Sequence, residues 1–228
     1  MALSLFEQTW WERGKAICLN NIAENYKSMN QLDKALAYTF RALRLNQKEE
    51  QKRGMAVNHE QIGELYRRMK RYEESLEYLE KGLKLAQQAD QNYQILPQIL
   101  LSIARNYNDR HEFPIALNYL QRATQQSRQH GDKLLHIQCY DEIANTFRLQ
   151  QEIDSAKVYF QKALETASAF GSIVEIAHIN QEMAQLAEMQ GDYKEALGYF
   201  QEYKTFNDSI ERKKNVVRAE LADFKYAA

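Results

Sequence analysis

The residues best suited to covalent chemistry are His136 and Cys139, which are three positions apart and would share one face of a helix. A cysteine activated by a histidine is the reacting pair of thiol hydrolases. Asp132 and His130 lie nearby, but their spacing suggests neither an orienting third group nor an oxyanion donor. The other interpretation is that Asp132 starts a helix and Cys139 is a half-buried thiol. We favour the second interpretation and expect no catalytic residues and no enzyme activity.

The spacing of the candidate ligands indicates neither a metal site nor a cofactor site. The sequence contains five histidines and two cysteines, but no His-x-x-x-His pair and no cysteine pair at zinc-site spacing. The Gly-Asp pairs at 131 and 191 fit turns better than a glycine-rich phosphate loop. We therefore expect no metal and no cofactor.

Two basic clusters, at residues 67–71 and 212–214, are candidates for binding a polyanion. The formal net charge of the chain is −1, and nucleic-acid binding would need more cations on one continuous face. We interpret both clusters as solvated charge and expect no nucleic-acid partner. No apolar run approaches 18 residues, so we also expect no membrane insertion.

The strongest pattern in the chain is a repeat of about 40 residues. A small residue returns at intervals of 40 or 41 residues, and a second small residue follows the first by twelve. An aromatic residue lies three positions after each small residue, except after Ala184. A fixed period between about 20 and 50 residues is typical of stacked repeat arrays. The first small positions are Ala23, Gly63, Ala104, Ala144 and Ala184, and the second are Ala35, Ser75, Ala116, Ala156 and Ala196.

Each repeat is predicted to be a pair of antiparallel helices. Apolar residues recur at helical spacing twice within a unit, and a polar break of only a few residues separates the two runs. Small residues allow the two helix axes to approach closely, because a larger side chain there would cost about 1–3 kcal/mol by overpacking. One hairpin cannot bury its own apolar face, so neighbouring hairpins must stack.

These repeats resemble the tetratricopeptide repeat (TPR) family. In the fifth unit the matching residues are Met183-Ala184, residues 191–197 and Tyr199-Phe200, although Ala187 replaces the first aromatic. The units are longer than the usual 34 residues of the family, as in kinesin light chain and many bacterial signalling proteins. The resemblance implies an all-α, right-handed α-α superhelix of about five hairpins that binds a protein or peptide. We expect a cytoplasmic protein, or alternatively a periplasmic sensor region of a membrane-bound parent.

The array is expected to cover residues 2–206. Residues 2–5 align one period back with residues 42–45, so the chain is expected to begin in a helix whose hairpin partner is absent, either because a segment was excised or because a repeat was lost. Cys18 and Cys139 fall three repeats apart, too far for a disulfide, and should be free thiols. The predicted parts are a partial helix at 2–8 and repeats at about 11–47, 51–90, 93–130, 133–170 and 173–206.

A separate C-terminal helix is predicted at residues 207–228. Tyr203 occupies a position that is small in the earlier repeats, and residues 208–211 carry the pattern of a helix start. The helix could cap the last hairpin, or connect it as a coiled coil to an output domain, as at the similar junction of bacterial sensor proteins. Its apolar stripe could instead pair two chains in a homodimer, through Ile210, Val217, Leu221 and Phe224. The alternative function is therefore self-assembly, through this terminal helix and the truncated N-terminal face of the array.

The resemblance also implies that a partner binds along the outer side of the first helix of each repeat. Amides are abundant there, and they can donate to and accept from a peptide backbone at once. Carboxylates outnumber cations, which favours a polar extended segment with basic residues. No repeat has the Lys, Asn and Arg set with which chaperone-binding TPR proteins hold an acidic C-terminal tail. The candidate binding residues are Asn20, Asn21, Glu24, Lys27, Glu60, Gln61, Glu64, Arg67, Arg68, Gln98, Arg105, Asn108, Asp141, Asn145, Arg148, His178, Gln181 and Gln185.

Overall fold

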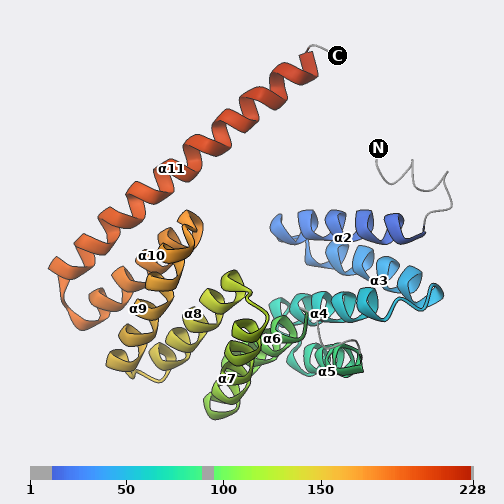
Figure 1. Ribbon diagram of the computed structural model, residues 1–228, viewed down its shortest axis with the longest axis horizontal. Coiled ribbons are helices and arrows are strands. Elements are labelled where there is room, and N and C mark those ends of the chain that lie inside the picture. Colours follow the sequence, from blue (N-terminus) through green and yellow to red (C-terminus); the bar gives the residue numbers. More distant parts are fainter. Residues whose placement is uncertain (1–11, 89–94, 227–228) are drawn as a thin grey trace. The chain divides into compact units, whose positions relative to one another are not determined.

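The computed structural model describes residues 12–88 and 95–226, and every regular element in those ranges is a helix (Figure 1). The partial helix predicted at residues 2–8 lies outside the described residues. The all-α fold is confirmed. The described helices are α2 (Glu12–Ser28), α3 (Leu32–Lys48), α4 (Lys52–Arg68), α5 (Tyr72–Gln88), α6 (Ile95–Asp109), α7 (Phe113–Gln129), α8 (Lys133–Leu149), α9 (Ile153–Phe170), α10 (Ile173–Gln190) and α11 (Tyr193–Tyr226).

The helices form five hairpins, in two compact units. Unit 1 (Met1–Gly131) holds the pairs α2/α3, α4/α5 and α6/α7, and unit 2 (Asp132–Ala228) holds α8/α9 and α10/α11. Within unit 1, α3 packs on α4 and α5 packs on α6; within unit 2, α9 packs on α10. In each unit, therefore, the second helix of one repeat is covered by the first helix of the next, which is the packing of a TPR solenoid.

The small residues lie where helices approach closely, as their repetition predicts. A Cβ added to Gly63 of α4 would lie 2.5 Å from Cγ of Leu79 in the partner helix α5. A Cβ on Gly82 of α5 would lie 3.2 Å from Cβ of His59 and 3.4 Å from Cδ1 of Ile99, which belongs to the next hairpin. Larger side chains at these positions would force the helices apart.

The repeated aromatic residues pair inside the hairpins. The ring centroids of Tyr26 and Tyr38 are 5.4 Å apart, and the equivalent pairs of the next three repeats are separated by 5.5 to 5.8 Å. Offset pairs at this distance add to the stability gained by burial alone. The fifth hairpin has Ala187 in place of the first ring, and Tyr199 there donates a hydrogen bond to Glu195 instead (3.3 Å).

The turn inside each hairpin contains one residue in the left-handed backbone region. In the fifth hairpin this residue is Gly191, with φ of 78°, which costs a glycine nothing. The fourth hairpin has Gln151 at the same place, with φ of 64°. The turn geometry therefore repeats although the residue type does not.

The prediction of a separate helix beginning at Asp208 is wrong. Helix α11 runs without a break from Tyr193 to Tyr226 (Figure 1), so the second helix of the fifth hairpin and the C-terminal segment are one element. Ser209 does not cap a new helix; its hydroxyl donates to the carbonyl oxygen of Thr205 (3.1 Å), a bond made inside a helix. No glycine or proline follows Gly198 to end the helix earlier.

Candidate functional site

Twelve of the predicted binding residues lie on the first helices of unit 1, and we call the surface that they form the first-helix face. Helix α2 contributes residues 20–27, α4 contributes residues 60–68 and α6 contributes residues 98–108. Asn21, Glu24 and Arg68 are exposed, whereas Glu60 and Asn108 are buried. The half-buried members are Asn20, Lys27, Gln61, Glu64, Arg67, Gln98 and Arg105.

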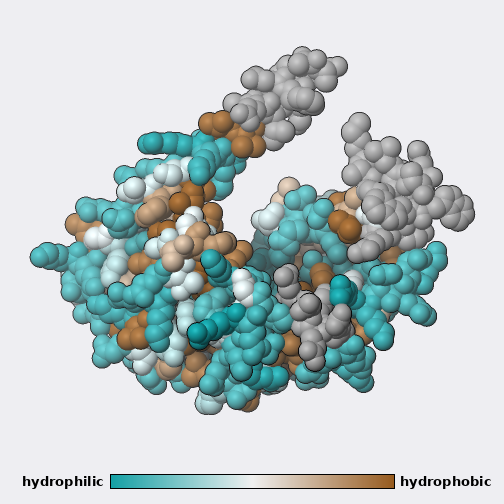
Figure 2. Space-filling view, viewed as in Figure 1, coloured by the Kyte–Doolittle hydropathy of each residue, from teal (hydrophilic) through white to brown (hydrophobic). Residues whose placement is uncertain are grey.

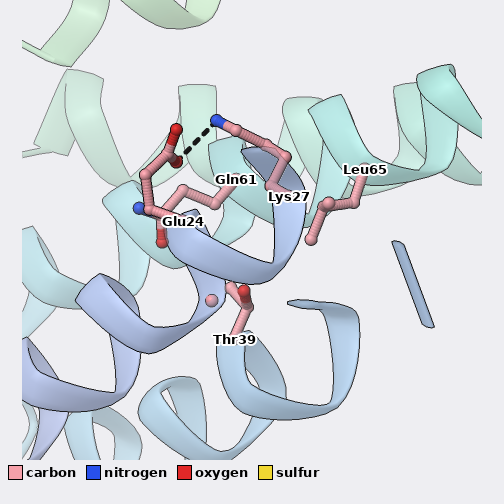
Figure 3. A pocket seen from close by; sticks show the side chains of 6 residues that line it. Glu24, Lys27, Thr39, Gln61 and Leu65 are labelled. Atoms are coloured by element: carbon pink, nitrogen blue, oxygen red, sulfur yellow. Dashed lines mark ion pairs between the residues drawn. The ribbon is translucent and has the colours of Figure 1, made fainter. Parts of the chain in front are cut away.

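A shallow pocket brings three of these residues together. Glu24 and Lys27 of α2 form an ion pair of 2.6 Å, and Gln61 of α4 lies beside them (Figure 3). The rest of the lining is supplied by Ala23, Thr39 and Leu65. The pocket thus offers one charge of each sign, an amide and a short apolar wall.

A cluster of charges joins α4 to α6. Arg67 pairs with Glu64 on its own helix (2.9 Å) and with Asp109 at the end of α6 (2.6 Å), and Arg68 also contacts Glu64 (3.0 Å). Burial alone would raise the pKa of Glu64, but the hydrogen bonds from Arg67 and Arg68 outweigh it and lower that pKa from 4.5 to about 2. Glu64 is therefore ionised at neutral pH, and its negative charge is paired with these two arginines.

Glu60 also lies between α4 and α6, but in a different environment. Its carboxylate accepts a hydrogen bond from the Ser102 hydroxyl (2.6 Å) and a longer one from Gln98 (3.5 Å), and the residue is only 8% exposed. Burial raises the pKa of Glu60 above its usual 4.5, although the hydrogen bond from Ser102 works in the opposite direction. Glu60 is thus a contact between adjacent repeats rather than an accessible binding group.

The substitution Glu60→Gln is expected to stabilise the protein at pH 7. Because the folded state raises the pKa of Glu60, the contribution of this group to stability is largest below pH 4.5 and falls as the pH rises above it. The variant lacks this dependence, so its advantage should be present at pH 7 and vanish at pH 4, as measured by urea unfolding. Glu77→Gln, at an exposed position of α5, is the matched control. A variant less stable than wild type at pH 7 would contradict the assignment.

A chain of three amides was not found by sequence reasoning. Asn46 of α3 donates to Asn58 of α4 (2.7 Å), and Asn58 donates to the side-chain oxygen of Asn20 on α2 (2.8 Å). This chain fixes the side-chain orientation of Asn20, a residue of the first-helix face. In the sequence, the only indication of this chain was that two of these asparagines lie at positions that helical spacing directs toward the core.

The other six predicted residues lie on α8 and α10 of unit 2. Nε2 of His178 is 3.3 Å from Oδ2 of Asp141, which links the two first helices of this unit. The hydrogen bond with Asp141 raises the pKa of His178, although burial opposes it. Arg148 donates to Asn145 (2.8 Å) and lies 3.6 Å from Glu182. Asp141 is buried, and the remaining two, Gln181 and Gln185, are half-buried and exposed respectively.

The other candidates for chemistry lie in unsuitable places. Cys139 is fully buried, so its thiol cannot meet a substrate, and Asp132 caps α8 by accepting a hydrogen bond from the backbone N–H of Leu135 (3.0 Å). Cys18 and Cys139 are both free thiols. Within the described ranges, no three His, Cys, Asp or Glu side chains gather as they would around a metal ion.

Three residues of the first basic cluster and one residue of the second form ion pairs. In the first cluster, Arg71 pairs with Glu74 (2.6 Å), in addition to the contacts of Arg67 and Arg68 with Glu64. In the second, Lys214 pairs with Glu211 (2.7 Å). The pairs of Arg71 and Lys214 fit the interpretation as solvated surface charge. Arg67 differs, because its side chain is only 19% exposed and it links α4 to α6.

Family comparisons agree with the helical hairpins. One sequence model, described as tetratricopeptide repeat, matches residues 54–129, and a second with the same description matches residues 137–170. The chain is a tetratricopeptide repeat protein. The two matched segments fall in unit 1 and unit 2 respectively, so both units of this TPR protein carry family repeats.

Solved structures with a similar fold include BtubC (BKLC) from P. vanneervenii. It shares 13% sequence identity with this TPR protein at a TM-score of 0.75, and the alignment covers 92% of this chain and 88% of that one. A Rap protein complexed with Competence and Sporulation Factor shares 15% identity at a TM-score of 0.78, covering 91% of this chain and 57% of that one. The Rap conjugation gene regulator of plasmid pLS20, in complex with the Phr* peptide, shares 15% identity at a TM-score of 0.74, with coverage of 87% and 54%.

These low identities establish the fold alone. No curated protein matches the sequence. Among the helices that the structure describes, none is long and apolar enough to cross a membrane.

Proposed function

We propose that this TPR protein binds a polar, extended peptide segment of a partner protein along the first-helix face of unit 1. The observation that carries the proposal is the row of amide and charged side chains on α2, α4 and α6, with the pocket between Glu24, Lys27 and Gln61 at one end of it. A surface of this composition is suited to holding a ligand.

The groups available to a ligand are mainly amides. Glu64 is already satisfied by arginines, and Glu60 is buried, so neither is available to pair with basic residues of a ligand. Asn20, Asn21 and Gln61 remain at least partly exposed. Because an amide both donates and accepts, these three side chains can hydrogen-bond the backbone of an extended peptide whatever its sequence.

Two of the proteins with a similar fold are Rap proteins, solved in complex with Competence and Sporulation Factor and with the Phr* peptide. This likeness supports a role in binding a peptide or protein. The resemblance to arrays in bacterial sensor proteins leads us to propose further that the protein is a sensory or scaffolding region of a signalling protein.

The test is selection of linear peptides from a random phage-displayed library on the full chain, followed by anisotropy titration of the selected peptides. The triple variant Asn21→Ala, Glu24→Ala, Gln61→Ala should weaken binding at least about 10-fold, because a lost hydrogen bond costs about 0.5–1.5 kcal/mol. Asn118→Ala, exposed on α7, is the control. Equal affinity of the triple variant and wild type would refute the proposed surface.

Self-association through α11 is a second candidate, favoured by the exposure of two apolar side chains. Val216 is 58% and Val217 is 53% exposed on a part of the helix that extends beyond α10 (Figure 1). Figure 2 shows this apolar surface beside the grey end of the helix. Ile210 is half-buried, and the side chains of Leu221 and Phe224 lie outside the described residues. Light scattering that shows a dimer for wild type and a monomer for Val217→Asp would support this candidate; a wild-type monomer would eliminate it.

A further inference from the structure

The outer side of α11 exposes a position that earlier repeats bury. Phe200 is 51% exposed, whereas Thr39, Leu79 and Phe160, at the same position of the first, second and fourth repeats, are fully buried. Each of these three lies on a second helix that is covered by the first helix of the next hairpin. Phe200 therefore belongs to a surface built for stacking, and among the described residues no further hairpin stacks on it.

The exposed surface is a stripe of large apolar side chains. Tyr193 and Leu197 are 74% and 57% exposed, and the rings of Phe200 and Tyr203 lie 5.8 Å apart. Spacings of four, three and three place all four residues on one side of α11. We call this set the α11 stripe. Tyrosine and phenylalanine are enriched in the cores of protein interfaces, and single-sided apolar stripes of this kind usually bind something.

The interior of unit 2 shows what kind of surface complements this stripe. Phe160, the equivalent of Phe200, packs with Ile176, Ile179 and Met183 of α10 in the hydrophobic core. The complement of the stacking face is therefore a helix that presents aliphatic side chains at helical spacing. The α11 stripe continues this established interface by one further helix.

At Tyr203, a helix that covers the α11 stripe must differ from α10. The equivalent residues are Gly82 and Ala163, and a Cβ on Gly82 would lie only 3.4 Å from Ile99 of the next hairpin. Ile99 corresponds in the repeat to Ile179 of α10. A tyrosine cannot face an isoleucine at that separation without forcing the helices apart. A helix that covers the α11 stripe must therefore carry a small residue opposite Tyr203.

We propose that the α11 stripe is a docking site for an amphipathic α-helix of a partner protein, with aliphatic residues that cover Leu197 and Phe200 and a small residue that faces Tyr203. This site is separate from the first-helix face and does not depend on the function proposed for it.

The probes are two synthetic helices based on residues 173–190, stapled between positions 178 and 185, which are exposed in α10. One has the natural sequence, and the other carries Ile179→Ala. The Ile179→Ala peptide should bind the full wild-type chain at least about 10-fold more tightly than the natural peptide does, since overpacking costs about 1–3 kcal/mol. In the Tyr203→Ala chain this preference should reverse.

Binding of the Ile179→Ala peptide should be lost in Phe200→Asp and retained in Phe170→Asp, a control at an exposed aromatic of α9 outside the stripe. Circular dichroism establishes that both variants stay folded. The proposal is overturned if neither peptide binds, if Phe200→Asp leaves binding unchanged, or if the preference does not reverse in Tyr203→Ala. It is also overturned if light scattering shows self-association that requires Phe200, because the stripe would then be occupied by a second copy of the chain.

Discussion

Replacing Phe160 with alanine is expected to lower the free energy of unfolding by about 3–5 kcal/mol, the usual cost of removing a large aromatic side chain from a packed core. Phe160 is fully buried in unit 2 and contacts core residues of α10. A loss of this size is a large fraction of the stability of an ordinary domain. Urea unfolding followed by far-ultraviolet circular dichroism measures it.

The same change one repeat later is the matched control. Phe200 occupies the equivalent position but is half exposed, so Phe200→Ala should change the free energy of unfolding by no more than about 0.5 kcal/mol. Because the two substitutions are chemically identical, the difference between their stability losses reports that the face of α9 is covered and the face of α11 is not. Similar losses for both variants would mean that α11 is covered in solution.

Replacing Arg67 with alanine should destabilise the protein by about 2 kcal/mol, since hydrogen bonds to charged groups contribute about 1.5–3 kcal/mol and the partner Asp109 is partly exposed. The substitution removes the link between α4 and α6 and leaves Glu64 largely buried with fewer partners. Lys214→Ala is the control, because the Lys214–Glu211 pair lies on the surface and within a single helix.

The loss of stability in Arg67→Ala should depend on pH. The titration of Glu64 determines whether this loss grows or shrinks as the pH falls. A carboxyl group whose pKa is lowered from 4.5 to about 2 on folding contributes stability above pH 4.5, and this contribution is lost as the pH falls towards 2. The difference between wild type and Arg67→Ala should therefore shrink as the pH falls from 5 to 2. A difference that stays constant over this range would show that Arg67 acts through packing rather than through its pairing with Glu64.

The hairpin architecture could be predicted from the sequence because close helix packing restricts residue size. Only a small residue fits at Gly63 or Gly82, so the 40-residue period is imposed by sterics and is visible without any alignment. The aromatic pairs follow from the same register. The turns were less predictable, because Gln151 and Gly191 adopt the same left-handed geometry with different side chains.

The start of a separate C-terminal helix was mispredicted because capping patterns are local. Residues 208–211 have the composition of a helix start, but helix α11 was already formed before them and no residue breaks it. A capping sequence inside a continuing helix simply forms bonds such as that from Ser209 to Thr205.

The sequence could predict on which side of its helix each candidate residue lies, but not how accessible that residue is. Helical spacing assigns a residue to a side of its own helix, and it cannot show what an adjacent repeat covers. Glu60 and Asn108 have the right direction and are nevertheless buried, and Glu60 contacts Ser102 of the next first helix. The Asn46–Asn58–Asn20 chain was missed for the related reason that it joins three helices.

Amide hydrogen exchange of the full chain, with and without a library-selected peptide, tests the proposed binding surface most directly. Backbone amides of helices exchange through local opening, and a ligand that bridges helices suppresses that opening. We expect protection concentrated in α2, α4 and α6, and little change in α3, α5 and α7. Protection confined to the second helices, or to α11, would contradict binding at the first-helix face.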